Sequence, residues 1–277
     1  MSEEPFRSLG AQRWLPSKVA SLREAIETIR DGDIVALGGM TLHRRPVAAC
    51  AEIIRLGRRE LTLLDYIASF EGDILIGAGA VSTVRSCYFG MDVLGLAPMH
   101  RRAVAQGIVR VVEETEATIA YGLRAARARV DFLPARIWQE TDLHSVRPDL
   151  KRVTSPYGGQ SYIAVPALVP DVAIVHALMA DPAGNTVLGG NYSLDRDITA
   201  VARTTIITAE RVVTTAEIEE YEADILGGWV DHVVELPEGA RPTSCVPAYN
   251  VDFTFLADYV EACAAGSFDT FLERRVL

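Results

Sequence analysis

Lysine is nearly missing from this chain of 277 residues, in which Lys18 and Lys151 are the only two. With so few lysines, Schiff-base chemistry is a poor expectation. Acidic residues outnumber basic ones, 37 against 27, and the formal net charge is −10. Such a chain has no basic stripe to neutralise a phosphate backbone, so nucleic acids and anionic membrane surfaces are not expected partners. A small ligand or another protein fits the composition better.

Cysteine and long apolar runs are also scarce. The four cysteines, at positions 50, 87, 245 and 263, show no metal-ligand or redox spacing, and we expect reduced thiols packed among other side chains. No run reaches the ~20 apolar residues that a membrane span requires. Residues 1–15 are mixed and charged, without the apolar stretch of a secretion signal. These absences predict a cytoplasmic protein.

Short, continuously apolar segments alternate with helix-length segments along the chain. Strands of this kind are buried on both faces, which favours a mostly parallel sheet in an open three-layer α/β/α sandwich. No linker divides the chain, so a single domain over residues 1–277 is expected, with residues 136–152 as a long surface loop. The expected strands are residues 34–37, 61–64, 74–76, 86–89, 108–113, 205–208 and 232–235, and the expected helices are residues 21–29, 46–56, 98–106, 117–129 and 253–265.

A pair of glycines, Gly38 and Gly39, follows the first expected strand and precedes Met40 and Thr41. Glycines after a strand let backbone N–H groups approach a ligand, such as a carbonyl oxygen or a phosphate. The turn lacks the third glycine of a dinucleotide fingerprint and the lysine of a P-loop, which leaves an oxyanion-binding role. The alternative is that the glycines only permit a tight turn.

An acidic cluster at residues 113–116 stands where an expected strand gives way to a helix. Carboxylates in a first helical turn are favoured by the helix dipole without any catalytic purpose. The rival interpretation is that Glu116, or Glu113, points into a cleft where partial burial makes it a general base or nucleophile.

Two histidines need separate interpretations. His176 interrupts an apolar strand and is expected to be a hydrogen-bonded core residue. His43 follows the glycine turn as a cleft residue or, with Arg44 and Arg45, as part of a solvated cap. Neither has a second ligand at metal spacing, so no metal site is expected. No serine stands in a Gly-x-Ser-x-Gly elbow, so a Ser-His-Asp hydrolase is also unsupported.

An ordered set of segments resembles the α subunit of glutaconate CoA-transferase and of its family I relatives, from about residue 21 to residue 277. The resemblance implies an α/β/α sandwich that pairs with a β subunit, with acyl-CoA bound in a cleft between them. Coenzyme A would be a substrate, with no other cofactor. The matching segments are residues 32–41, 45–46, 73–79, 86–88, 132–134, 165–168, 170–177, 181–185 and 239–245.

In enzymes of this type the nucleophilic glutamate belongs to the β subunit, within a Glu-Asn-Gly-like motif that this chain lacks. The resemblance therefore implies a chain that is inactive alone and that contributes cleft residues, which are Gly38, Gly39, Met40, Thr41, Ser86 and Asp92. It leaves open whether the assembly is a heterodimer or a heterotetramer.

Two positions depart from the glutaconate pattern. Asp92 stands where those enzymes carry a substrate-contacting serine, and its charge would disfavour a dicarboxylate substrate. Glu116 aligns with a glutamine there, but resembles a glutamate of two-subunit hydrolases that open a ring in steroid CoA thioesters. Three hypotheses follow: a CoA-transferase α subunit first, a ring-opening hydrolase α subunit with Glu116 as base second, and a ligand-sensing module third.

Overall fold

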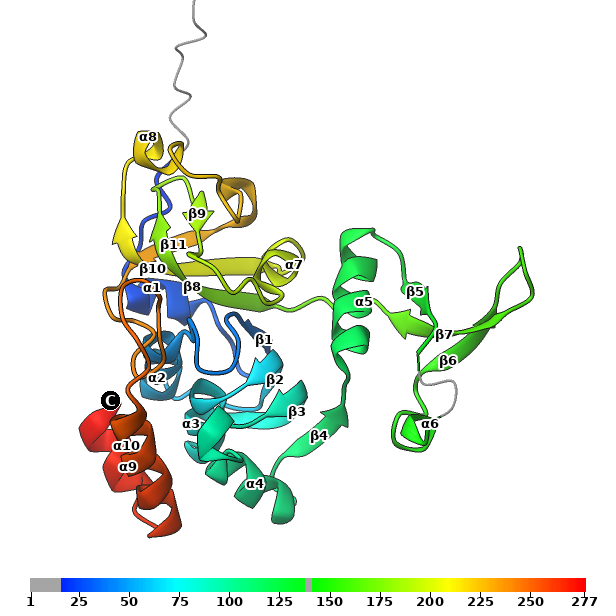
Figure 1. Cartoon of the computed structure of the whole chain (residues 1–277), viewed down its shortest axis with the longest axis horizontal. Coiled ribbons are helices and arrows are strands. Elements are labelled where there is room, and N and C mark those ends of the chain that lie inside the picture. Colours follow the sequence, from blue (N-terminus) through cyan, green and yellow to red (C-terminus); the bar gives the residue numbers. More distant parts are fainter. Residues whose placement is uncertain (1–15, 138–140) are drawn as a thin grey trace, which may run out of the picture.

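A large β-sheet forms the centre of the computed structural model, which describes residues 16–137 and 141–277 (Figure 1). In these residues the sheet has eight strands, in the order β11-β10-β8-β1-β2-β3-β4, with β9 paired to β8. Only the β8–β9 pairing is antiparallel. The strands are β1 (Ile34–Leu37), β2 (Leu61–Ala68), β3 (Val81–Phe89), β4 (Arg110–Glu113), β8 (Val172–Ala180), β9 (Thr186–Val187), β10 (Thr204–Val212) and β11 (His232–Glu235).

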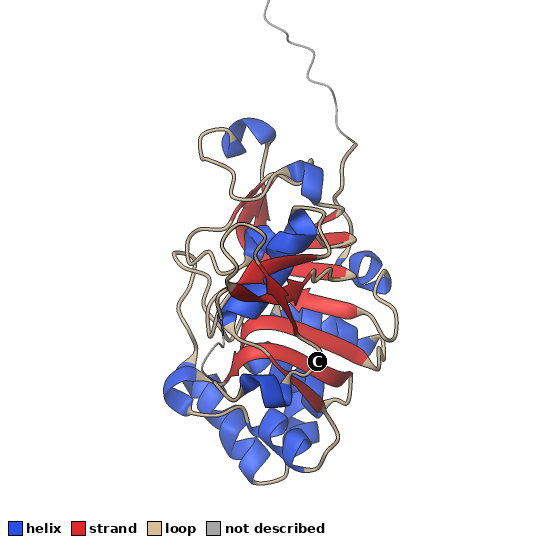
Figure 2. Ribbon diagram, turned by 90° about the vertical axis from the view of Figure 1, so that its right-hand side faces the viewer, coloured by secondary structure: helices blue, strands red, loops and turns tan. Residues whose placement is uncertain are grey.

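Helices cover both faces of this sheet (Figure 2), which confirms the open three-layer sandwich. The two-residue period of a strand divides the core: Val35 and Leu37 pack with one helical layer, and Ala36 packs with the other. The first layer holds α1 (Leu22–Glu27), α2 (Val47–Arg55), α3 (Phe70–Gly77), α4 (Pro98–Ala105), α9 (Phe253–Ala264) and α10 (Phe268–Arg275); the second holds α5 (Glu116–Arg127) and α7 (Asp195–Thr199), and α8 (Thr215–Ile218) follows β10.

Local sequence signals fix several helix starts. The Thr115 side chain accepts a hydrogen bond from the backbone N–H of Thr118, and the Thr118 hydroxyl in turn accepts from the Thr115 N–H. This reciprocal cap places Glu116 at the first position of α5. Ser21 and Glu24 cap α1 in the same way.

Two elements differ from the sequence expectation. The strand expected at residues 74–76 is wrong, because this stretch lies in α3, which is buried on nearly all sides. A short apolar run without polar alternation does not distinguish a buried strand from a buried helix. Helix α10 was not expected, although Phe268, Phe271 and Leu272 have the helical spacing with which they pack into the core.

Residues 132–166 form an arm that projects from the main sheet (Figure 1). The arm contains an antiparallel sheet in the order β5-β7-β6, with β5 (Phe132–Ala135), β6 (Lys151–Thr154) and β7 (Ser161–Pro166), and a small core of its own. The surface loop expected at residues 136–152 is therefore only partly correct, since it contains α6 (Leu143–Val146) and the start of β6. Residues 138–140 of that prediction lie outside the described residues.

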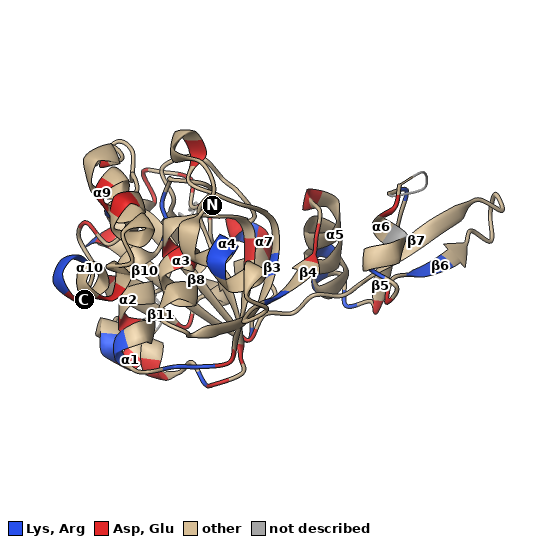
Figure 3. Ribbon diagram, turned by 90° about the horizontal axis from the view of Figure 1, so that it is seen from below, with Lys and Arg blue, Asp and Glu red and all other residues tan. Residues whose placement is uncertain are grey.

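Lysine and arginine are spread over α1, α4, α10 and β6 rather than gathered in one stripe (Figure 3). In the described part of the chain no helix combines the length and the apolar character needed to cross a membrane.

Candidate active site at the carboxyl edge of the sheet

The chain order of the strands diverges between β1 and β8. From β1 the chain builds β2, β3 and β4 on one side, and then returns to place β8, β10 and β11 on the other. In open parallel sheets the crevice beyond the carboxyl ends of the strands at such a switch point is the usual ligand site. The glycine turn, which follows β1, lies at this point.

Both glycines of the turn are required by close packing. A Cβ on Gly38 would clash with the Asp195 carboxylate, and a Cβ on Gly39 would lie 2.5 Å from the His43 carbonyl oxygen. Gly39 also has a φ of +78°, which side chains rarely adopt. Its N–H donates to Asp195 Oδ1 at 2.7 Å. The turn is held against α7 by its backbone.

The remaining backbone donors of the turn are also engaged within the chain. Gly38 N–H donates to the Ile174 carbonyl, Met40 N–H to the His43 carbonyl, and Thr41 N–H to the Ile67 carbonyl. The expected oxyanion role of these N–H groups is therefore not supported, because each one already has an acceptor. That Gly38, Gly39, Met40 and Thr41 line a substrate site stays a prediction.

Arg44 and Asp195 form a fully buried ion pair beneath the turn, with the guanidinium Nη2 2.8 Å from Asp195 Oδ2. The same guanidinium donates to the carbonyl oxygens of Gly190, Asn191 and His176. Every nitrogen of the guanidinium is thus committed to the fold. The pair joins the turn after β1 to the carboxyl end of β8 and to the segment after β9.

Arg45 lies in a second buried cluster, between the carboxylates of Asp65 and Glu71. Burial raises the pKa of Asp65, and the neighbouring Glu71 carboxylate raises it further, against the opposing effect of Arg45. The solvated cap considered for residues 43–45 is therefore wrong for both arginines. Their carboxylate partners are distant in the sequence, which is why the local charge pattern indicated solvent exposure.

His43 is half-buried, and its Nδ1 atom lies 2.7 Å from the Ser244 hydroxyl oxygen. Burial lowers the pKa of His43, and the adjacent Arg44 lowers it further, so the imidazole is neutral at pH 7. Of the two interpretations left open for His43, the structure supports the cleft residue.

An open pocket of about 490 Å³ lies at this edge, and we call it the switch-point pocket. Thr41, Asp92 and Asn191 in its wall have φ values of 51°, 53° and 51°, in the left-handed region. Strained backbone of this kind concentrates at functional sites. The lining residues are Thr41, Leu42, His43, Asp92, Gly189, Gly190, Asn191, Ser244, Val246, Val251 and Phe253.

The acidic cluster at residues 113–116 separates into different roles. Glu114 is the buried member: its carboxylate pairs with Arg85 at 2.5 Å and Arg147 at 3.0 Å. Glu113 and Glu116 are exposed, so the partial burial invoked for a catalytic Glu116 is not present in this chain by itself. The sequence did not show that Glu114, and not Glu116, is the carboxylate bound into the fold.

Ser86 and Glu116 lie apart from the lining of the switch-point pocket, toward the ends of β3 and β4. The Ser86 hydroxyl donates to the Tyr88 carbonyl at 2.7 Å. Burial raises the pKa of Tyr66, at the end of β2, and the nearby Glu116 carboxylate raises it further. The structure thus brings Thr41 and Asp92 together in one pocket, and places Glu116 beside a tyrosine that the sequence did not indicate.

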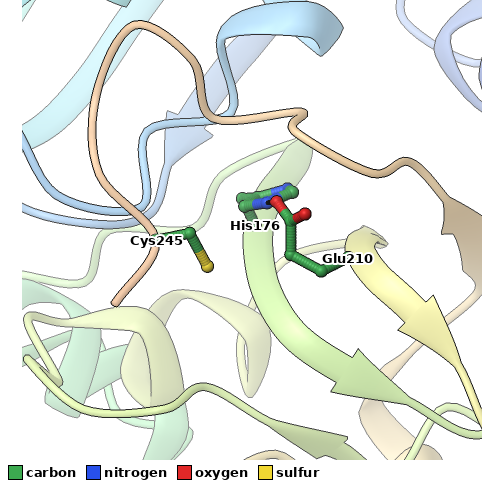
Figure 4. A group of neighbouring side chains, drawn as sticks. All are labelled: His176, Glu210 and Cys245. Carbon is green, nitrogen blue, oxygen red and sulfur yellow. Dashed lines mark hydrogen bonds and ion pairs between the residues drawn. The ribbon is translucent and has the colours of Figure 1, made fainter. Parts of the chain in front are cut away.

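His176 is fully buried on β8, as expected of a core histidine (Figure 4). Its Nε2 atom lies 2.7 Å from a Glu210 oxygen, and its Nδ1 atom 2.9 Å from the Thr208 hydroxyl. Cys245 completes a group whose possible metal-ligand atoms lie within 4.8 Å of one another, which sequence spacing did not indicate. Since protein hydrogen bonds already engage both nitrogens and both Glu210 oxygens, we assign the group to the core.

A larger apolar pocket, of about 690 Å³, lies on the arm between β5 and the β6–β7 hairpin. Tyr157, in the connection between these hairpin strands, is 98% exposed. This pocket is far along the chain and the fold from the switch point. We therefore place the candidate site at the sheet edge, where the charged groups converge.

The model of the coenzyme A transferase family matches residues 19–236, which is most of the chain. This chain belongs to the coenzyme A transferase family. The resemblance seen in the sequence is thereby confirmed, and the chain is part of an enzyme of this family, with the character of an α subunit.

Named relatives divide between two chemistries. The chain is 34% identical over 263 residues to the corresponding subunit of the glutaconate CoA-transferase of Acidaminococcus fermentans, covering 88% of this chain and 82% of that protein. It is 33% identical over 260 residues to the IpdA subunit of the cholesterol ring-cleaving hydrolase of Rhodococcus jostii, covering 88% and 86%. An uncharacterized protein of Archaeoglobus fulgidus is 34% identical over 253 residues, which span 90% of this chain but 56% of that protein.

The crystal structure of the A. fermentans glutaconate coenzyme A-transferase superposes with a TM-score of 0.87 at 33% identity, covering 94% of this chain and 89% of that chain. The fold and the family are therefore shown by sequence and structure together.

Proposed function

We propose that this chain is the α subunit of a two-subunit CoA-transferase, which moves CoA between an acyl-CoA thioester and a carboxylic acid. The main support is the switch-point pocket, open at the sheet edge of a chain that belongs to this family. A β subunit would close the pocket and supply the nucleophilic glutamate.

Exposed apolar side chains at the pocket favour such a partner. Val93 and Leu96, which flank the segment after Asp92, are 78% and 60% exposed, and Val246 and Phe253 at the pocket wall are also exposed. Contiguous exposed apolar surface of this kind marks an interaction site. Closed symmetric assembly of such pairs would give a heterodimer or a heterotetramer, which native mass measurement distinguishes.

The proposed chemistry is a double exchange at carbonyl groups. The β-subunit carboxylate attacks the thioester carbonyl, the C–S bond breaks, and CoA thiolate leaves an acyl-glutamyl anhydride. The thiolate then attacks the glutamyl carbonyl, which releases the first acid and leaves a glutamyl-CoA thioester. An acceptor carboxylate reverses both steps. Coenzyme A is a substrate throughout, and the proposal includes no metal, no further cofactor and a cytoplasmic location.

The contribution of this chain is to build and hold the acyl end of the cleft. The buried Arg44–Asp195 pair fixes the turn after β1 and the segment through Asn191, which together carry much of the pocket wall. Because these groups are committed to the fold, they do not enter the reaction.

A second candidate is a CoA-thioester hydrolase in which Glu116 acts as base on a cyclic acyl group. The position of Glu116 favours it: the carboxylate is exposed at the start of α5, close enough to Tyr66 to raise the pKa of that phenol. A partner subunit would have to bury Glu116 for it to gain the basicity this role needs.

The deciding experiment uses this chain co-purified with its β subunit. CoA exchange is measured across an acyl-CoA panel with and without an acceptor acid, in the wild type, in Glu116→Gln and in the matched control Glu113→Gln. Exchange that requires the acceptor and survives Glu116→Gln supports the transferase. Acceptor-independent turnover lost in Glu116→Gln and retained in Glu113→Gln supports the hydrolase.

A further inference from the structure

The switch-point pocket has an unusual charge balance for a site that would bind an acid. Its lining contains no lysine and no arginine among the described residues. The nearby guanidinium of Arg44 is fully buried, and its nitrogens donate to Asp195 and to backbone carbonyls of the pocket wall. No cation of the described lining is therefore left to pair with a carboxylate.

The ionised side chain in the described lining is itself negative. Asp92 begins a short 3-10 turn, is exposed and has a φ of 53°. His43 in the same wall is neutral, because burial and Arg44 both lower its pKa. The rest of the lining is apolar or uncharged, including Val246, Val251 and Phe253. A carboxylate placed here would meet Asp92 without a compensating positive charge.

We propose that the switch-point pocket selects an acyl group that carries no charge at its far end, and that Asp92 is the residue that excludes dicarboxylic acyl groups. This inference rests on the proposed function, because it takes the pocket as the acyl site of a CoA thioester. It separates the chain in substrate class from relatives whose names specify a dicarboxylate.

Binding measurements on the complex of this chain with its β subunit test the inference without requiring turnover. The probes are two unreactive thioethers of equal length, S-pentyl-CoA and S-(4-carboxybutyl)-CoA. Wild-type complex should bind the uncharged probe about tenfold more tightly or better, as expected for unpaired like charges in a partly desolvated site. Tighter binding of the carboxylated probe would overturn the inference.

Asp92→Asn is the matched variant, because asparagine tolerates a left-handed backbone at least as well as aspartate. It should reduce the discrimination between the two probes by about tenfold. Asp269→Asn, which removes the same charge at an exposed position of α10, should leave the ratio unchanged. An unchanged ratio in Asp92→Asn would overturn the role of Asp92.

Salt gives a test on the wild-type protein alone. Between about 0.05 and 0.5 M NaCl, the discrimination should fall in the wild type and stay flat in Asp92→Asn, because an open pocket is screened. A salt-independent ratio would instead indicate shape selection and contradict the inference. If the two probes are discriminated as expected but no acyl-CoA supports CoA exchange, the transferase proposal fails and the charge selection stands.

Discussion

Two sets of charged residues meet at the carboxyl edge of the sheet and have opposite environments. The floor, which we define as Arg44, Arg45, Asp65, Glu71 and Asp195, is fully buried and paired. The rim, which we define as Asp92, Glu113 and Glu116, is exposed.

The comparison separates stability from chemistry. A buried charge is costly unless its partner stays in place, so the floor is tied to the folding free energy. An exposed charge costs the fold little, so the rim is free to act on a ligand or a partner subunit. The following predictions test this division.

The largest effect is expected from Arg45→Met. The substitution leaves Asp65 and Glu71 buried without their cation, and we expect a loss of about 3–5 kcal/mol in the free energy of unfolding. Arg23→Met is the control, since Arg23 is exposed and pairs with Glu27 on the surface, and it should change stability by less than about 0.5 kcal/mol. Denaturant unfolding of both variants measures the difference; equal values would erase the distinction between floor and rim.

Gly39→Ala should cost about 3 kcal/mol, because it combines a positive φ with a Cβ 2.5 Å from a carbonyl oxygen. Gly57→Ala separates the two causes, since Gly57 also has a positive φ of +68° but has nothing within 4 Å of its Cβ position. We expect about 1 kcal/mol for that control. A similar loss in both variants would show that packing against the turn contributes nothing.

A pH dependence follows from Asp73, a buried carboxyl group on α3. Burial raises its pKa to about 6, although Tyr259 and the N–H groups of Met99 and His100 donate to it. Because the folded pKa lies above the unfolded value near 3.8, the stabilising contribution is complete at low pH and is lost as pH rises to about 6. The loss should be about 2–3 kcal/mol.

Asp73→Asn checks this, as the variant should show a smaller fall in unfolding free energy between pH 4 and pH 6 than the wild type. Parallel curves for the two proteins would assign the fall to other groups.

The smallest effects on stability belong to the rim. Glu113→Gln and Glu116→Gln should each alter the unfolding free energy of the isolated chain by no more than about 0.5 kcal/mol. Thermal unfolding of the two variants measures this. A loss of about 2 kcal/mol in Glu116→Gln would make Glu116 a structural residue and remove the main support for the hydrolase alternative.

Sequence reasoning failed at particular elements for physical reasons. Residues 74–76 looked like a strand because α3 is apolar on nearly every side, and period alone does not separate the two structures. Arg44 and Arg45 looked solvated because the residues that neutralise them are remote: Arg44 and Asp195 are 151 positions apart. The pairing of Tyr66 with Glu116 has no sequence signal, since neighbouring strand ends meet only in the folded sheet.

The sequence by itself determined the sandwich, the family and the position of the turn after β1, because continuously apolar strands and an ordered set of segments are properties of the chain. It also placed Thr41 and Asp92 among the candidate site residues. Only the tertiary structure decided which charges are buried, which N–H groups are free and which residues share the switch-point pocket. The reason is that burial and hydrogen bonding depend on contacts between distant segments, which local composition does not specify.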